Sequence, residues 1–156
     1  MRAFLQLCFL RFFPAWLLAF ILASVFHSHF VLFELVALNI NIPITKWAYM
    51  VFADMRGLAL TYGMIIAVAL AISFFIAHLL LNWLKKTDNS SAGQSKSNAI
   101  TIFMFGVAGA VGFFIMLVAM QPILNVTLIA GARTWMGIIA QCFAGFVSGI
   151  CFAKLS

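Results

Sequence analysis

Charged side chains are scarce in this sequence. Only 8% of its 156 residues are charged and only three are acidic, whereas 66% are hydrophobic. An ordinary water-soluble domain has about half apolar and about a quarter charged residues. The composition therefore excludes such a domain and predicts a protein whose solvent is lipid. The net charge is +6, but the nine Lys and Arg residues form no dense basic stripe, so we expect no nucleic-acid partner.

Cysteine is also rare, and each cysteine falls in an apolar segment. Cys142 and Cys151 are nine residues apart, which places them on opposite faces of a helix, where they cannot pair. With Cys8 as the third, the chain has no pair of thiols in a polar loop. This pattern excludes a disulfide oxidoreductase, and we interpret all three as small hydrophobic residues.

Long uncharged runs are what the chain does contain. About 20 apolar residues in a helix cross a bilayer core about 30 Å thick. Four runs of this kind predict membrane spans at about residues 12–31, 58–83, 99–120 and 135–153, in one domain covering residues 1–156 with a polar loop at 84–98. Residues 1–10 would form a short surface segment, and Pro14 would occupy the opening turn of the first span. The alternative, a cleaved signal peptide, is disfavoured because Arg11 and Pro14 interrupt its apolar stretch.

The distribution of basic residues predicts the orientation. Cytoplasmic loops are enriched in Lys and Arg. With both termini inside, six basic residues are cytoplasmic (Arg2, Arg11, Lys85, Lys86, Lys96 and Lys154) and three are outside (Lys46, Arg56 and Arg133). We therefore expect a multi-pass protein of a cell inner membrane with cytoplasmic N and C termini.

The segment between the first two spans, residues 31–57, is too apolar for a solvated loop, and Pro43 interrupts it. We expect one or two short helices that lie in the outer interface, with Trp47 and Tyr49 at the level of the headgroups. Asp54 and Arg56 precede the second span and would anchor it, with Asp54 at or before its first turn. The predicted fold class is an all-α membrane protein, a four-transmembrane-helix bundle with short interfacial helices between helices 1 and 2.

Small residues four positions apart predict where the spans contact one another, because association in lipid depends on close approach of backbones. The predicted packing residues are Ala59, Gly63, Ala67 and Ala71, with a second ridge of Ala69, Ser73 and Ala77, in span two; Gly106 with Ala110 and Ala108 with Gly112 in span three; and Ala140, Ala144, Gly145, Ser148 and Gly149 in span four. Two ridges on one helix require neighbours on two sides. A compact bundle and a homo-oligomer both satisfy that requirement.

Four polar residues within or near the spans form a candidate polar site. His27 and His29 would bind a metal or haem only in an extended segment, with Glu34 as a third ligand, because side chains two apart diverge by about 200° on a helix. The favoured interpretation is a pair of interfacial histidines near the outer headgroups, and the metal or haem site is the alternative. Glu34 also admits a small proton-coupled pump with one embedded glutamate, although it lies near the outer surface. Gln141 is expected to form a hydrogen bond between helices.

Arg56 and Arg133 form a second candidate site. Both precede a helix that re-enters the membrane from the outside, so helix N-termini and guanidinium groups would together favour an anion, such as a lipid phosphate or a substrate carboxylate. Ordinary anchoring to lipid is the alternative.

No spacing in the sequence matches a nucleophile beside a base, a carboxylate pair or a phosphate-binding glycine loop. We therefore expect no enzymatic activity, no catalytic residue, no cofactor and no metal. The favoured function is an accessory, scaffold or assembly subunit that acts through helix packing. Its expected partners are membrane lipids and either further copies of the chain or a larger membrane protein. The alternative is a small-solute or lipid transporter or channel formed by oligomerisation.

Overall fold

The computed structural model describes the whole chain except residues 1, 39–42, 88–93, 125–133 and 156, and, within the helices, the side chains of residues 2–9, 85, 87, 94–97 and 121–124. Its helices are α1 (Arg2–Ala37), α2 (Ile44–Leu58), α3 (Tyr62–Thr87), α4 (Gln94–Leu124) and α5 (Trp135–Leu155). All but α2 contain a stretch long and apolar enough to cross a membrane: Leu10–Ala37, Tyr62–Leu84, Asn98–Met120 and Trp135–Leu155. The predicted all-α fold with four spans and a short helix between the first two is confirmed.

Helices α1, α4 and α5 are longer than the expected spans, whereas α3 has the expected length but begins at Tyr62 instead of residue 58. Helix α1 begins at Arg2, so residues 2–10 belong to this helix and do not form the separate surface segment that was expected at residues 1–10. For the same reason Pro14 lies inside α1 and not in its first turn. The first twelve residues of α1 are mostly good helix formers. Proline removes one helical hydrogen bond, to the carbonyl of Leu10, which is the first residue of the apolar span, so water or lipid headgroups can replace that bond. Similarly, residues 84–87 continue α3 and residues 94–98 begin α4, so most of the predicted polar loop is helical.

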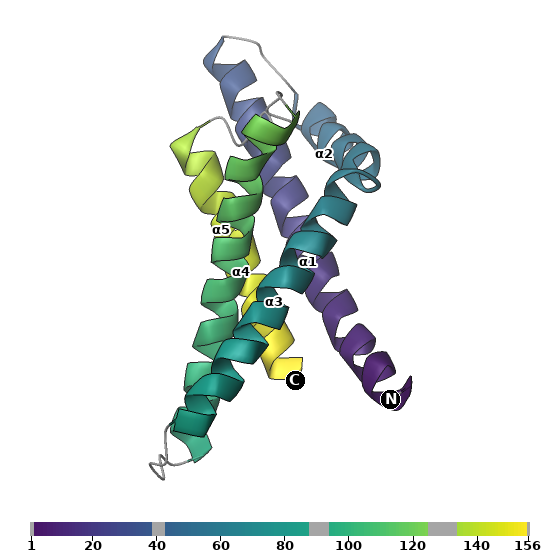
Figure 1. The fold of residues 1–156 in the computed structure, drawn as a ribbon. Helices are drawn as coiled ribbons and strands as arrows, with labels where there is room; N and C mark the ends of the chain where they lie inside the picture. Colours follow the sequence, from purple (N-terminus) through teal and green to yellow (C-terminus); the bar gives the residue numbers. More distant parts are fainter. Residues whose placement is uncertain (1, 39–42, 88–93, 125–133, 156) are drawn as a thin grey trace.

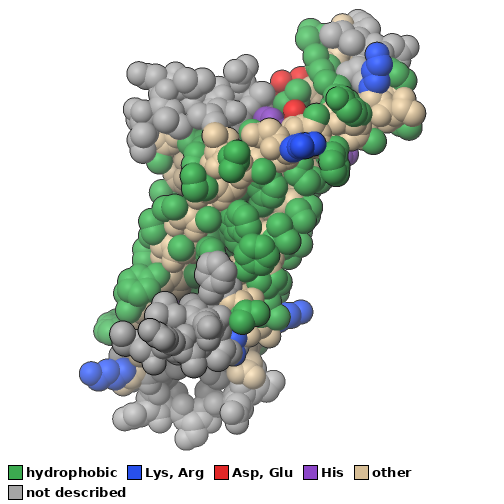
Figure 2. Space-filling view, turned by 90° about the vertical axis from the view of Figure 1, so that its right-hand side faces the viewer, with side chains coloured by type: hydrophobic (Ala, Val, Ile, Leu, Met, Phe, Trp, Pro, Cys, Tyr) green, Lys and Arg blue, Asp and Glu red, His purple; other side chains and the backbone are tan. Residues whose placement is uncertain are grey.

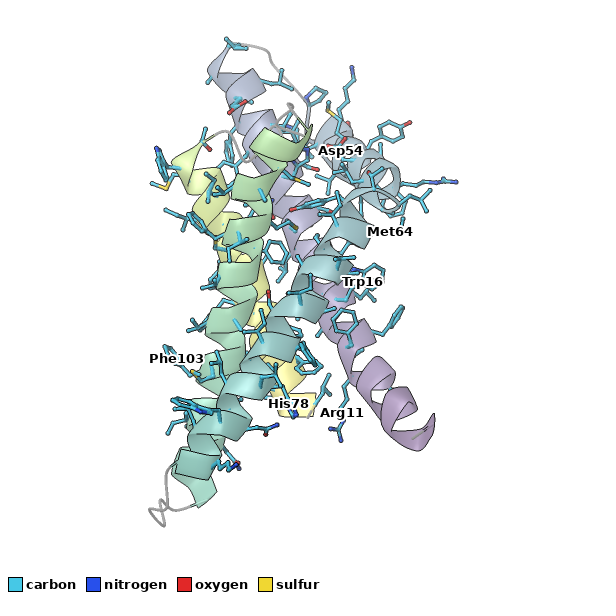
Figure 3. All side chains as sticks on the ribbon, in the orientation of Figure 1. Arg11, Trp16, Asp54, Met64, His78 and Phe103 are labelled. Carbon is cyan, nitrogen blue, oxygen red and sulfur yellow. The ribbon has the colours of Figure 1, made fainter. Side chains whose placement is uncertain are left out.

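Different helix ends and different charged residues lie at the two ends of the bundle. Figure 1 shows the start of α1 and the end of α5 at the same end, which we call the terminus end. We call the opposite end, where α2 projects to one side at the level of the start of α3, the α2 end. Helix α5 packs against both α1 and α4, while α3 packs mainly against α4. Figure 3 shows Arg11 and His78 toward the terminus end and Asp54 at the α2 end.

Glycines allow α4 and α5 to meet backbone to backbone. A Cβ atom on Gly109 would collide with the Gly145 carbonyl group, and one on Gly145 would collide with the Gly109 carbonyl group. Gly149 lies equally close to the backbone of Phe105, and Gly106 lies against the ring of Phe146. We call these four glycines, 106, 109, 145 and 149, the glycine interface. At Gly109, Gly145 and Gly149 no larger residue fits without separating the helices, whereas at Gly106 the Phe146 ring would have to move.

The first of the two ridges predicted on α3 is not a continuous interface. Ala59 and Ala71 are exposed, and Ala67 is only partly buried. Gly63 is buried beside the rings of Trp16 and Phe20 of α1. The ridge breaks because Ala59 belongs to the turn between α2 and α3, while large residues decide which face of α3 is buried: Tyr62, Ile66, Leu70, Phe74 and Leu81.

The second ridge on α3 faces α4. Ala77 is buried, and the side chain of Ser73 lies where a Cβ atom on Gly112 would be. On α5, Ala144 and Ser148 are buried and Ala140 is partly buried.

Aromatic rings fill the bundle toward the terminus end. The Phe74 and Phe152 rings are stacked with their centroids 4.6 Å apart, and Phe105 lies 5.2 Å from Phe152. Phe12 meets Phe74 edge to face at 6.3 Å. These four rings join α1, α3, α4 and α5 without any hydrogen bond, and such pairs are favourable beyond the area that they bury.

Candidate functional site

Buried polar side chains gather in the half of the bundle nearer the α2 end. We call the group Ser24, His27 and Ser28 of α1, Tyr62 of α3 and Gln141 of α5, together with the partly buried Asp54 of α2, the polar junction. The sequence of α1 explains its position. Ala15, Ala19 and Ala23, four residues apart, are fully buried and let α5 approach closely. The buried polar residues of α1 that follow these alanines are Ser24, His27 and Ser28.

Gln141 ties three helices together. Its Oε1 accepts a hydrogen bond of 3.1 Å from the Tyr62 hydroxyl, and its Nε2 donates one of 2.9 Å to the Ala23 carbonyl oxygen. The hydrogen bond between helices expected of Gln141 is therefore present. Seven residues further along α5, the Ser148 hydroxyl donates to the Ala15 carbonyl oxygen at 2.8 Å. Both α5 side chains thus reach backbone carbonyls of α1 that small neighbours leave accessible.

Asp54 attaches α2 to α1. The Ser28 hydroxyl donates a hydrogen bond of 3.0 Å to Asp54 Oδ2. The Trp47 ring adds edge contacts to His29 and Phe33, with centroids 6.0 and 5.8 Å away. The predicted place of Asp54, at the start of the second span, is wrong because α2 continues to Leu58 and α3 begins only at Tyr62. Asp54 is a contact between helices instead of a helix cap.

Arg56 also differs from its predicted place. It is exposed in the last turn of α2, where the negative end of the helix dipole favours a cation. It does not precede α3 directly, so the N-terminus of a spanning helix does not contribute to an anion site at Arg56. Arg133, the other half of that hypothesis, lies outside the described residues.

The histidines and Glu34 do not converge. Residues 2–37 are helical, so the extended segment that a His27–His29 metal or haem site requires does not form. His27 is buried, whereas the His29 ring shares a hydrogen bond of 2.8 Å with the Val25 carbonyl oxygen one turn away. Glu34 is exposed. Among the described residues, no three His, Cys, Asp or Glu side chains could hold a metal ion together.

Sequence reasoning missed three contributors. Tyr62 and Ser24 are both fully buried. The sequence does not reveal the role of Tyr62, because a tyrosine at the start of a span is equally typical of a residue that anchors the helix in the headgroups. Gly109 is missing from the predicted packing residues, although glycines recur every third residue at 106, 109 and 112, of which the first two face α5 and the third faces Ser73 of α3. That spacing was the available signal. Ser24 is distinctive because its buried Oγ has no hydrogen-bond partner among the described residues.

An open apolar groove of about 720 Å³ runs between α3 and α4. Four small residues line it, Ala69, Ser73, Gly112 and Ala119, together with large ones such as Ile72 and Ile115. Among the described residues that line it, Ser73 alone carries a hydroxyl, which donates to the Ala69 carbonyl oxygen at 2.8 Å. Figure 2 shows one face of the bundle, apolar through its middle, with basic side chains toward the two ends.

The chain matches no known protein-family model, no curated protein and no solved structure. Functional inference therefore rests on the polar junction, the glycine interface and the groove.

Proposed function

We propose that this chain is a non-enzymatic component of a cell inner membrane, an accessory, scaffold or assembly subunit that acts through packing of transmembrane helices. Both termini face the cytoplasm in this proposal. The shared end of the two termini and the six-to-three distribution of basic residues support that orientation. The coarser statement, a membrane protein with four apolar helices, does not depend on the proposal.

The open groove between α3 and α4 is the observation that carries this function. Lipid solvates apolar side chains as well as another helix does, so helices associate where backbones can approach closely. Ala69, Ser73 and Gly112 give the groove small surfaces, and large side chains such as Ile72 line it as well. A further transmembrane helix would gain dispersion contacts there that flexible acyl chains match less well. Its source is a second copy of the chain or a larger membrane protein.

The experiment compares two substitutions that are identical in size. Ala69→Leu places three extra carbons in the groove, whereas Ala71→Leu adds them on an exposed position of the same helix. The protein is extracted in mild detergent and its mass is measured by native mass spectrometry, with crosslinking in intact membranes as a second readout. We expect the wild type and Ala71→Leu to exceed the 17.2 kDa of one chain and Ala69→Leu to dissociate.

The same measurement separates the two occupants. A mass that is a multiple of one chain indicates a homo-oligomer, and an added mass of another size indicates a partner. Wild-type protein that is monomeric both in detergent and in crosslinked membranes would refute the scaffold function.

The polar junction favours a second candidate, a small-solute transporter or channel. Its specific observation is Ser24, whose fully buried hydroxyl has no partner among the described residues and lies one turn from His27 and Ser28. A solute that crosses the bundle would find in this hydroxyl a hydrogen-bond partner. Vesicles containing the protein would then release glycerol faster than empty vesicles, and Ser24→Val would slow the release. Equal rates for protein-containing and empty vesicles would count against this candidate.

A further inference from the structure

Among the described helices, α2 has the least internal packing. None of its residues is buried. Its partly buried residues share one face, which lies against α1: Trp47, Val51, Asp54, Met55 and Leu58. The remaining surface of this amphipathic helix is open.

The charges of α2 are segregated. Its only acid, Asp54, is turned toward α1 and accepts the hydrogen bond from Ser28. Its two cations, Lys46 and Arg56, are exposed and form no ion pair among the described residues. At about 100° per residue they fall within one sector of about 80°, on the side of the helix away from the centre of the face that lies against α1. We call this sector the basic stripe: Lys46, Tyr49, Ala53 and Arg56. The open face of α2 therefore carries positive charge only.

An apolar edge runs beside the basic stripe. It consists of Ile44, Ala48 and Phe52, four residues apart. The side chains of Ile44 and Phe52 are 85% and 71% exposed, and Tyr49 on the stripe is 76% exposed. A helix with an apolar edge next to a basic one, and with a tyrosine among the basic residues, matches the boundary between hydrocarbon and headgroups.

We propose that α2 binds the headgroups of anionic phospholipids in the leaflet at the α2 end of the bundle. Ile44 and Phe52 enter the hydrocarbon, and Lys46 and Arg56 bind the phosphate and the net negative charge of the lipid. A zwitterionic phospholipid satisfies the apolar edge equally well but lacks the net charge. This inference is independent of the scaffold function, because it concerns α2 and not the groove between α3 and α4.

The test uses the full chain in mild detergent, titrated with phosphatidylglycerol or phosphatidylcholine, with bound lipids counted by native mass spectrometry. The variant Lys46→Gln/Arg56→Gln removes both cations of α2. The matched control, Lys86→Gln/Lys154→Gln, removes two exposed cations at the terminus end. We expect the α2 variant to lose about tenfold in apparent affinity for phosphatidylglycerol, because each basic residue near an anionic surface contributes appreciably to binding. Its binding of phosphatidylcholine should fall much less, because the choline group of that lipid offsets the charge of the phosphate.

A second variant separates charge from apolar insertion. Phe52→Ser should weaken the binding of both lipids to a similar extent, because it removes apolar area without changing charge. Circular dichroism checks that every variant keeps its helix content. Equal losses of phosphatidylglycerol in the α2 variant and in the terminus-end control would overturn the proposal. So would undiminished phosphatidylglycerol binding by Lys46→Gln/Arg56→Gln.

Discussion

Helix α5 is held by two interfaces that differ in kind. Toward α4 it meets the glycine interface, where Gly145 and Gly149 touch the backbone at Gly109 and Phe105. Toward α1 it is held by side-chain hydrogen bonds, from Gln141 to the Ala23 carbonyl oxygen and from Ser148 to the Ala15 carbonyl oxygen. One face of the same helix is thus fixed by shape and the other by polar groups.

The comparison shows two ways of joining helices where no hydrophobic driving force is available. Close backbone contact depends on the absence of side chains, so one added carbon atom disturbs the whole interface. Hydrogen bonds within membranes contribute about 0.6 kcal/mol on average, so the loss of one lowers the free energy of unfolding only slightly. We expect the glycine interface to fail abruptly and the polar junction to weaken stepwise.

The largest effect is expected from Gly109→Ala. Its methyl group would meet the carbonyl group of Gly145, and backbone atoms cannot move aside as a flexible side chain can. We expect a loss of at least about 2 kcal/mol in the free energy of unfolding, the range for overpacked cores. The measurement is unfolding by dodecyl sulfate titrated into mild-detergent micelles, followed by circular dichroism.

Gly57→Ala is the matched control for Gly109→Ala. A Cβ atom on Gly57 has no atom within 4 Å, and the residue lies in α2. Alanine should therefore stabilise the protein slightly, by about 0.5 kcal/mol, because it reduces the freedom of the unfolded chain. If both substitutions had the same sign and size, the close contact between α4 and α5 would be wrong.

A smaller effect is expected at the polar junction. Gln141→Leu leaves the buried Tyr62 hydroxyl without its partner, and Tyr62→Phe leaves Gln141 Oε1 without its donor. We expect each variant to lose about 1 kcal/mol of unfolding free energy. The double variant should lose clearly less than the sum, because no unpaired group from that bond remains. Strict additivity in the same detergent assay would show that the two side chains do not interact.

The smallest effect on global stability is expected at α2. Asp54→Ala removes the acceptor of the Ser28 hydroxyl, but α2 contains no buried residue, so the free energy of unfolding should change by less than about 0.5 kcal/mol. Local opening should increase instead. Hydrogen exchange of residues 44–58, followed by mass spectrometry, should accelerate about tenfold in Asp54→Ala. In Arg56→Ala, two positions away on the exposed face, exchange should remain at the wild-type rate.

The sequence predicted the elements that depend on composition. Uncharged runs near 20 residues located all four spans, and Pro43 within an apolar segment indicated the short helix α2. Helix ends were predicted less well, because helices continue beyond the hydrocarbon wherever the flanking residues favour a helix. Residues 2–10 of α1 and residues 84–87 of α3 are of this kind.

The choice of interface could not be predicted, because it depends on which face of a helix meets which neighbour. Ala71 of α3 resembles Ala144 of α5 in local sequence, yet the first is exposed and the second is fully buried. Asp54 is predicted at a helix start because it precedes a long uncharged run, but its partner in the structure, Ser28, lies 26 residues away in the chain. Contacts at that separation leave no periodic signal in the sequence.

The position of α5 has a consequence for biosynthesis. It is the last of the described helices to leave the ribosome, yet it supplies the partner of the Tyr62 hydroxyl and the surface that covers Gly109. Until Trp135 and the residues after it have entered the bilayer, the earlier helices present a bare glycine face and an unpaired phenol to lipid. A nascent chain interrupted before that point would display both, and these are the features by which a quality-control protease could distinguish an unfinished copy from a complete one.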